Sequence, residues 1–499
     1  MSRTGLLASF LMMAGSGYFE LFTGLFRSVV VMRCLGPTGN GLVSIVRLLQ
    51  QYLSNSHLGV LHGLTKHLPR ALGAGDEERV AKIEDVGATW VLATSTLCAA
   101  GIAAIAIASS NLGLPTRYVL LIGAPVFLCG QMYDLYRAIG RAWQVYQPMV
   151  LASVVFSLAL TALMIVGAWL GWASGAMLGW LAASVASLMA LQATMRLRVC
   201  LRIDWSIVWR LVTSGIPLAA MAFADMLLVA LDGTLLLRRG ATTFGLYAGI
   251  AMQIRRYLFN LARSLTFVLM PHFLEQFARH GSHEKLRSTV MQAAAAASCA
   301  VPVLSLVSAV FLPAVVQTFV PRFYAAVPAG QVTAFATGLM ILPLSFSTAL
   351  VTLDAEWHSV AAQLAGAAVL AVLAWEPAGK GDMVGVALAS AAGSWFVAMT
   401  VGALALSRLG MGATRLTGTL LSLQVPIGLS VAMFWLANCL AETLTGLPHR
   451  TWAGCGVRLM ICVVLAGPGL AWAERRHLVL RRSLWTLAAM CTRSQRHRS

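Results

Sequence analysis

Charged residues are scarce in this sequence, and their scarcity decides the class of protein. Only 11% of the 499 residues are Asp, Glu, Lys or Arg, whereas soluble domains carry about 25%. Hydrophobic residues make up 59% of the chain, and its mean hydropathy is +0.78. This composition excludes a water-soluble globular protein. The apolar runs are continuous and not alternating, which excludes a β-barrel and predicts an all-α polytopic membrane protein.

The sequence also lacks the motifs of metal sites, disulfide frameworks and enzymes. Its nine cysteines show no CxxC or CxH spacing, and most lie in apolar runs, so we interpret them as small packing residues. No Gly-rich phosphate loop follows a strand, and the turns predicted outside the membrane are too short to house a catalytic domain. We therefore expect no enzyme activity, no metal site and no cofactor.

Long apolar runs recur along the chain and predict about fourteen transmembrane helices. Each run is close to the ~20 residues that a helix needs to cross the hydrocarbon core. The pair between 149 and 195 is divided only by the sequence GWASG. The predicted spans are residues 7–32, 42–64, 87–109, 117–140, 149–171, 174–195, 211–237, 243–270, 289–312, 327–352, 357–375, 383–406, 417–440 and 452–473.

An internal repeat organises these spans. Residues 211–273 align without a gap on residues 6–68, at a shift of 205 positions. Transporters built from such repeats bind their substrates where the two repeats meet. The repeat predicts two six-helix lobes in pseudo-twofold relation, residues 1–200 and 201–406. Two additional helices at 407–473 and a basic amphipathic cytoplasmic tail at 474–499 would follow, with a disordered basic tail as the alternative for the last segment.

Basic residues are distributed unevenly between the two sides of the predicted membrane. With the N-terminus inside, the inside segments hold 23 Lys and Arg residues and the outside turns hold 7. Because cytoplasmic loops are rich in Lys and Arg, both termini are predicted to lie in the cytoplasm. This signal and the attraction to anionic lipid headgroups explain the formal charge of +18 without a nucleic acid partner.

Eight ionisable residues lie at bilayer depth in spans 1, 2, 7 and 8. Each would cost about 2.5–3.5 kcal/mol in contact with lipid, so they must face one another or water. Several are seven residues apart, which puts both members of a pair on one helix face. We predict a shared central cavity in which five arginines exceed three carboxylates, as an anion site requires. The arginines are Arg27, Arg47, Arg255, Arg256 and Arg263, and the carboxylates are Glu20, Asp225 and Asp232.

Two plainer interpretations stay open for these residues. Asp225 and Arg256 lie at matched depth and could form a structural ion pair that holds two helices together. Arg27 and Arg47 lie in the outer third of their spans, from which an arginine can extend its side chain to the membrane interface.

Four short motifs resemble those of one transporter superfamily. RCLGPTGNG follows span 1, SGIPLA opens span 7, GLYAGIAMQI begins span 8 and FVPRFYAA follows span 9. With its parallel repeats and two additional spans, nearly the whole chain resembles the multidrug/oligosaccharidyl-lipid/polysaccharide (MOP) exporter superfamily. Within it, the chain is most similar to the polysaccharide branch, the Wzx-like flippases of lipid-linked oligosaccharides.

This resemblance implies a bacterial inner-membrane protein that flips an undecaprenyl-pyrophosphate-linked oligosaccharide from the cytoplasmic to the periplasmic leaflet. The product would serve exopolysaccharide, capsule or O-antigen lipopolysaccharide synthesis, with polysaccharide polymerase and assembly proteins as partners. The five arginines would bind the pyrophosphate, and Glu20, Asp225 or Asp232 would take up a proton or sodium ion. The two aspartates depart from an all-cationic lumen, so they are either paired or used in ion coupling.

A multidrug antiporter of the same fold is the main alternative function. It would need an acidic and aromatic cavity for organic cations, whereas the predicted cavity is basic. A membrane polymerase or ligase would ordinarily carry a large outside loop with catalytic Arg or His residues, which this sequence lacks. A transport-inactive scaffold would leave the ionisable residues at bilayer depth unexplained.

Overall fold

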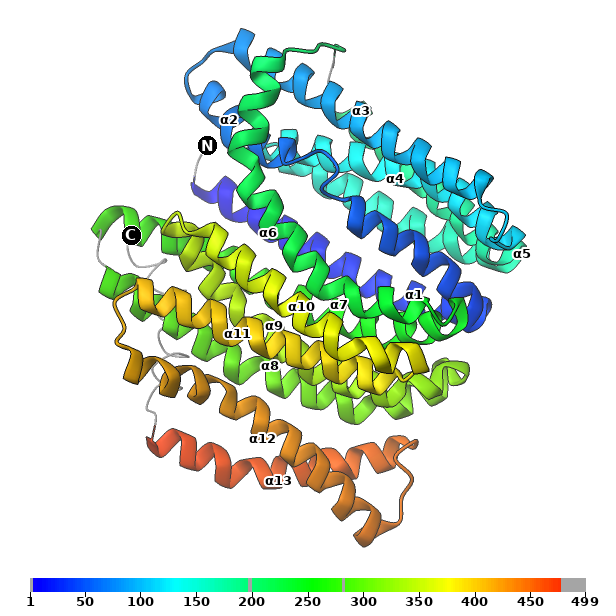
Figure 1. Ribbon diagram of the computed structural model, residues 1–499, viewed down its shortest axis with the longest axis vertical. Coiled ribbons are helices and arrows are strands. Elements are labelled where there is room, and N and C mark those ends of the chain that lie inside the picture. The colour runs from blue at the N-terminus through cyan, green and yellow to red at the C-terminus, as the bar shows by residue number, and fades with distance from the viewer. Residues whose placement is uncertain (1–2, 196–199, 281–282, 477–499) are drawn as a thin grey trace. The chain divides into compact units, whose positions relative to one another are not determined.

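The structure, a computed structural model, is built of helices (Figure 1). It describes the backbone of residues 3–195, 200–280 and 283–476, with their side chains except at 3–11, 13–14, 261–280, 283, 285 and 466–476. The described residues contain thirteen α-helices, one 3-10 helix and no strand, which confirms the predicted all-α class. The predicted amphipathic tail lies outside the described residues from position 477 onward.

The chain divides into two compact units, Met1–Gly249 and Ile250–Ser499. The two lobes predicted above, with their boundary at residue 200, were defined by the sequence repeat and not by contacts. They stay a prediction. Unit 1 contains α1 (Arg3–Leu53), α2 (Val60–Gly73), α3 (Glu77–Ala108), α4 (Leu114–Ala142), α5 (Tyr146–Met195), α6 (Trp205–Leu237) and the start of α7 (Ala241–His280). Unit 2 contains the rest of α7, α8 (His283–Phe319), the 3-10 helix η1 (Pro321–Ala326), α9 (Val327–Thr352), α10 (Glu356–Lys380), α11 (Met383–Arg408), α12 (Ala413–Thr445) and α13 (Trp452–Arg476).

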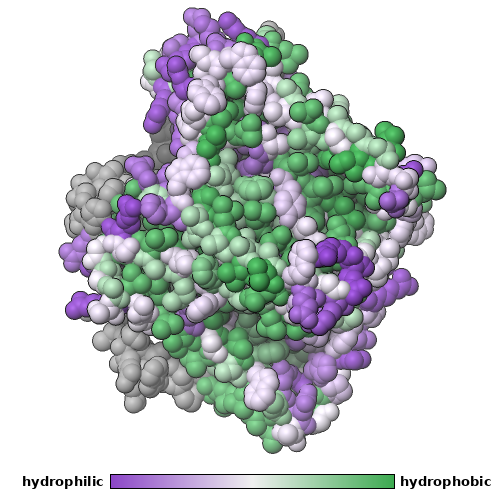
Figure 2. Space-filling view, viewed as in Figure 1, coloured by the Kyte–Doolittle hydropathy of each residue, from purple (hydrophilic) through white to green (hydrophobic). Residues whose placement is uncertain are grey.

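Ten helices among the described residues are long and apolar enough to cross a membrane. Hydrophobic residues spread over much of the face seen in Figure 2. Large apolar side chains such as Leu97, Trp169 and Val372 are more than two-thirds exposed, at 74%, 79% and 76%. A surface of this kind suits lipid and not water. The protein is therefore a multi-pass membrane protein.

Helix α5 contains two antiparallel segments and not one rod. At 50 residues a straight helix would be about 75 Å long, more than twice the hydrocarbon thickness of a bilayer. The backbone leaves helical geometry at Gly171 and Trp172, where Trp172 has a φ of 52°. Beyond this point the chain folds back, because Gly167 lies directly against the backbone of Gly175. The two spans predicted on either side of the GWASG sequence are thus separate segments.

Helix α1 reverses in the same way at Gly36, which has a φ of 64°, and Pro37 begins its second segment. Thr23, in the first segment of α1, contacts the first segment of α5. Arg47, in the second segment of α1, contacts the second segment of α5. Each segment of α1 runs parallel to the α5 segment that it contacts, because the contacting residues follow the same order along both helices. In the first pair of segments Thr23 contacts Ser157 and Arg27 contacts Thr161. Leu35 then contacts Trp172, and Arg47 contacts Trp180. The two segments of α1 are therefore antiparallel to each other, as predicted for spans 1 and 2.

The predicted second span differs from the structure at its inner end. We expected one helix over residues 42–64, but α1 ends at Leu53 and α2 begins only at Val60. Leu58 and Gly59 have φ values of 53° and 86°, which a helix cannot accommodate. A Cβ atom at Gly59 would lie 2.7 Å from the carbonyl carbon of Gly215 in α6. Close backbone packing between α2 and α6 therefore accompanies the break.

One pair of equivalent positions of the repeat meets within unit 1, and close neighbours of that pair are also in contact. Asn40 and Gly245 are 205 positions apart, and the Asn40 side-chain amide donates a hydrogen bond of 2.9 Å to the Gly245 carbonyl oxygen. The Thr38 and Thr242 hydroxyls share a hydrogen bond of the same length. Gly41 lies directly against the backbone of Ala241. Small residues thus allow the second segment of α1 and the start of α7 to approach closely, as in other membrane helix pairs.

Apolar cores fix the helices of each unit. In unit 1, one core joins α1, α3, α4 and α5, and another joins α2, α3, α4 and α6. In unit 2, α12 and α13 share a core with α8 that includes Val310, Ala437 and Cys462. The two additional C-terminal helices are therefore packed parts of unit 2.

Candidate functional site

Polar side chains spaced four residues apart face one another across α1 and α5. The Thr23 and Ser157 hydroxyls are in direct contact. Four residues further along both helices, the Arg27 Nη1 donates a hydrogen bond of 3.4 Å to the Thr161 hydroxyl oxygen. Arg27 is only half-buried. Arg27 therefore contacts α5 without being fully buried.

Helix α4 extends this row of polar contacts. The Tyr133 and Ser153 hydroxyls share a hydrogen bond of 3.1 Å, and the Arg137 guanidinium carbon lies 5.6 Å from the Tyr133 ring centroid. Glu20 acts electrostatically on Tyr133. We call this group of side chains the polar seam; it comprises Glu20, Thr23, Arg27, Tyr133, Arg137, Ser153, Ser157 and Thr161.

The hydroxyl residues of the polar seam were not among the predicted site residues. Their signal in the sequence is the spacing of four between Ser153, Ser157 and Thr161, which puts three hydroxyls on one face of an otherwise apolar helix. That spacing matches the Thr23 and Arg27 pair on α1. A search for polar stripes that included uncharged residues would have found this surface.

Arg47 lies on the second segment of α1 and contacts an aromatic ring. Its guanidinium carbon is 5.8 Å from the ring of Trp180 in α5, within the range of a cation–π interaction. Arg47 and Trp180 are both half-buried. Arg27 and Arg47 thus both contact α5, and these contacts favour a role within the protein over extension of the side chains to the membrane interface.

Asp232 is fully buried and hydrogen-bonded. One carboxylate oxygen accepts a hydrogen bond of 2.7 Å from the Tyr247 hydroxyl of α7, and the other accepts one of 2.7 Å from the Gly233 backbone amide. Tyr247 is also fully buried. Tyr247 lies seven residues after Gly240 and Asp232 eight residues before it, so both lie at one depth of the hairpin. Counting residues from the turn between α6 and α7, which matched Asp225 with Arg256 in depth, also matches Asp232 with Tyr247.

Asp225 lies on the same helix face as Asp232 but in different surroundings. The two residues are seven positions apart on α6, which places them on one stripe. Asp225 is half-buried, whereas Asp232 is completely enclosed. The predicted acidic stripe therefore has one half-buried aspartate and one that is held inside the α6–α7 hairpin.

The predicted arginines of α7 belong to unit 2, and they also differ from each other. Arg255 is 1% exposed, whereas its neighbour Arg256 is exposed. Neighbouring residues of a helix point about 100° apart, so these two side chains cannot line one narrow stripe. The Arg263 side chain lies outside the described residues. The shared cavity of all eight ionisable residues stays a prediction.

The described part of the chain contains no group of three His, Cys, Asp or Glu side chains that could hold a metal ion. The eight described cysteines are free thiols, and Cys491 lies outside the described residues.

Several solved transporter structures have the same fold as this chain. A multidrug resistance MATE family transporter of the MOP superfamily, in an inward-facing conformation, matches with a TM-score of 0.65 at 13% identity, over 78% of this chain and 94% of that one. The lipid II flippase MurJ, in an inward closed conformation, matches with a TM-score of 0.68 at 10% identity, over 94% of this chain and all of that one. A MOP superfamily transporter from Pyrococcus furiosus, described as having a binding pocket of reverse polarity, matches with a TM-score of 0.57 at 15% identity, over 81% of this chain and 95% of that one.

These identities establish the fold alone: the chain has the fold of MOP superfamily transporters. No protein-family model matches the sequence, and a search of curated proteins finds no significant match. The extent of the structural matches nevertheless differs. Residues 1–406 are about 81% of the chain (406/499), so a match over 94% must include part of the two additional helices.

Proposed function

We propose that this chain is a flippase that moves an undecaprenyl-pyrophosphate-linked oligosaccharide from the cytoplasmic to the periplasmic leaflet of a bacterial inner membrane. The oligosaccharide would serve the synthesis of a cell-surface polysaccharide such as exopolysaccharide, capsule or O-antigen. The observation that carries the proposal is the match to the lipid II flippase, because it extends over 94% of the chain and so includes part of the two additional helices. The match to the multidrug transporter covers 78%.

The polar seam supplies the groups that an oligosaccharide needs within a membrane. Sugar hydroxyls exchange hydrogen bonds with Ser, Thr and Tyr hydroxyls, and here such groups follow one another along α1, α4 and α5. The planar fork of an arginine suits the oxygens of a pyrophosphate. In our proposal the guanidinium groups of the half-buried residues Arg27 and Arg47 receive the pyrophosphate, and the hydroxyls of the seam bind the glycan.

The energetics of outward movement suit an anionic substrate. An inside-negative membrane potential assists the outward movement of negative charge by about 2.3 kcal/mol per charge for each 100 mV. The polyprenyl chain stays in lipid, since only the pyrophosphate and the glycan require a polar path. The protein would alternate between states open to each side of the membrane. Uptake of a proton or sodium ion by Glu20, Asp225 or Asp232 would reset the cycle.

A multidrug antiporter is the second candidate, and specific residues favour it. Organic cations bind to aromatic faces and carboxylates, and the polar seam contains both Glu20 and the Tyr133 ring. The multidrug transporter match has a TM-score of 0.65. The two candidates differ in the sign of the charge that they move, which makes them separable by experiment.

The deciding experiment is reconstitution of the purified full-length protein in liposomes, with two substrates compared. We expect translocation of a polyprenyl-pyrophosphate oligosaccharide and no efflux of a fluorescent organic cation. Arg27→Gln should slow the translocation about tenfold or more, since a lost charge-assisted hydrogen bond is worth about 1.5–3 kcal/mol. Arg33→Gln is the matched control, because Arg33 is an exposed arginine of the same helix outside the seam.

Two results would contradict this proposal. If Arg27→Gln flips the lipid-linked sugar as fast as the wild type, the seam does not bind the pyrophosphate through this residue. If only the organic cation moves, and Glu20→Gln abolishes that movement, the protein is an antiporter.

A further inference from the structure

A guanidinium group lies buried near the loop that joins α12 and α13, and within the described ranges it forms no ion pair with a carboxylate. Arg458 is 2% exposed, and its Nε donates a hydrogen bond of 2.8 Å to the Asn438 side-chain oxygen. Its Nη1 donates to the carbonyl oxygens of Leu447, at 3.4 Å, and Gly454, at 3.1 Å. Its Nη2 has no hydrogen-bond partner among the described residues. All three acceptors are neutral, so the positive charge is not compensated by this part of the chain.

A second arginine, Arg450, lies exposed on the same loop and rests on an aromatic ring. Its guanidinium carbon is 4.4 Å from the ring centroid of Tyr324 in η1. Stacking on a ring orients a guanidinium group while leaving its edge N–H groups available for an anion. None of these N–H groups has a hydrogen-bond acceptor within the described residues. Arg450 is therefore oriented in advance for an anionic group.

Basic side chains lie close to His449 in the same loop. The pKa of His449 is lowered below its ordinary value by partial burial and then by the positive charges of Arg458 and Arg450. Glu442 opposes this effect and is the one acidic group among the described residues that acts on His449. Two arginines thus outnumber one carboxylate at this end of the helix pair.

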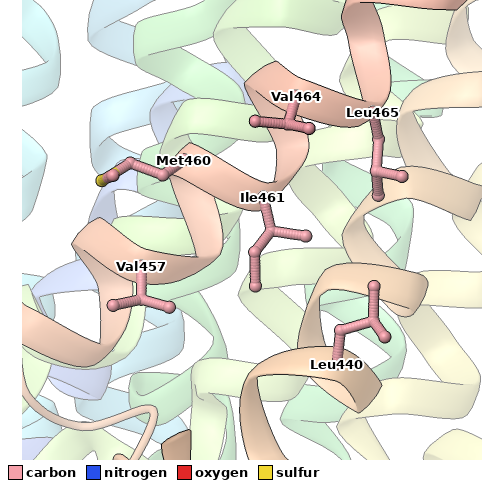
Figure 3. A pocket seen from close by; sticks show the side chains of 6 residues that line it. All are labelled: Leu440, Val457, Met460, Ile461, Val464 and Leu465. Carbon is pink, nitrogen blue, oxygen red and sulfur yellow. The ribbon is translucent and has the colours of Figure 1, made fainter. Parts of the chain in front are cut away.

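An apolar groove lies along α13 and begins one residue before Arg458 in the chain. It has a volume of about 370 Å³ and is lined only by aliphatic side chains and a methionine (Figure 3). Val457 adjoins Arg458 in the chain, and the groove continues for two helical turns along α13. Its lining residues are Leu440, Val457, Met460, Ile461, Val464 and Leu465. A groove of this size falls within the range of small-ligand sites, and its lining accepts only apolar groups.

The residues around the loop place the arginines at the level of lipid headgroups. Trp452 begins α13, is 49% exposed, and donates from its indole N–H to the Thr318 hydroxyl oxygen at 3.2 Å. Half-exposed Trp residues at helix ends mark the membrane interface. Arg450 lies two residues before Trp452, whereas the groove lies on the part of α13 that enters the membrane.

We propose that the α12–α13 pair binds a molecule of anionic phospholipid, with its phosphate at Arg450 and one acyl chain in the apolar groove. Arg458 attracts the phosphate from beneath, through the electrostatic field of its uncompensated charge. The bound lipid would be a resident component of the protein and not its transported substrate. A zwitterionic phospholipid carries a compensating positive charge, so it should bind more weakly.

Native mass spectrometry of the delipidated full-length protein tests this proposal. Phosphatidylglycerol and phosphatidylcholine with identical chains are titrated separately. We expect tighter binding of phosphatidylglycerol, and a loss of about fivefold in its affinity on Arg450→Gln, as for one cation near a membrane surface. Met460→Trp, which fills the groove, should weaken the binding of both lipids. Lys380→Gln is the matched control, because Lys380 is an exposed cation of unit 2 on another helix.

Arg458→Gln should also lower the affinity for phosphatidylglycerol if the variant folds. If it does not fold, Arg450→Gln still tests the site, because Arg450 is exposed. Equal binding of the two lipids would overturn the proposal, as would an Arg450→Gln variant that binds phosphatidylglycerol as well as Lys380→Gln does. If a polyprenyl pyrophosphate displaces phosphatidylglycerol at much lower concentration, the groove is a substrate site and the resident-lipid proposal is wrong.

Discussion

The hydrogen bond between Tyr247 and Asp232 permits a quantitative test of the α6–α7 hairpin. Both residues are fully buried, and the bond is 2.7 Å long. Tyr247→Phe removes this donor and leaves the Gly233 amide bonded to the other carboxylate oxygen. A hydrogen bond to a charged group contributes about 1.5–3 kcal/mol, so Tyr247→Phe should lower the free energy of unfolding by that amount. Equilibrium unfolding in mixed detergent micelles measures this loss.

A double-mutant cycle separates the bond from other effects of the substitution. In an Asp232→Ala background, Tyr247→Phe should cost close to nothing, because the acceptor is already gone. Tyr118→Phe is the control, since Tyr118 is 56% exposed. If Tyr247→Phe destabilises the protein no more than Tyr118→Phe, or costs the same in both backgrounds, the carboxylate is not held by this hydroxyl and the reasoning fails.

Two further predictions concern the packing and the pH response of unit 1. Gly215→Ala should destabilise the protein by about 1–3 kcal/mol, because the new Cβ would lie against the backbone of Gly59; Gly73→Ala, with open space at its Cβ position, should be neutral or slightly stabilising in the same unfolding assay. His67 hydrogen-bonds to Ser214, and burial together with nearby basic residues lowers its pKa below the ordinary 6.5. The unfolded chain then binds a proton more readily than the folded protein, so the free energy of unfolding should fall as the pH drops below about 6.5. His67→Gln should reduce the difference in unfolding free energy between neutral and mildly acidic buffers. A difference unchanged by His67→Gln would show that other groups control the response.

Some geometric relations within the candidate site follow from the sequence because hairpins relate depth to distance from the turn. Residues equally far from a turn lie at one depth, and this rule matches Asp232 with Tyr247 across Gly240. Helical spacing likewise put Glu20 and Arg27 on one face of α1, and the structure places both in the polar seam. These features depend on local geometry alone.

Other features depend on contacts between distant parts of the chain. The break at Leu58 and Gly59 occurs where α2 packs against Gly215, more than 150 positions away along the chain. Arg255 and Arg256 are chemically identical neighbours, and only the packing of unit 2 makes the first buried and the second exposed. The uncompensated charge of Arg458 is visible only once its neutral acceptors are located.

The sequence by itself determined the all-α membrane class, the order of the helical segments and the repeat of 205 positions, because hydrophobicity, helical periodicity and internal similarity are properties of the chain alone. The tertiary structure decided which polar residues touch, which of two neighbouring arginines is buried, and where a predicted helix is interrupted. These outcomes depend on how close two backbones can approach, which is set by side chains that are far apart in the sequence.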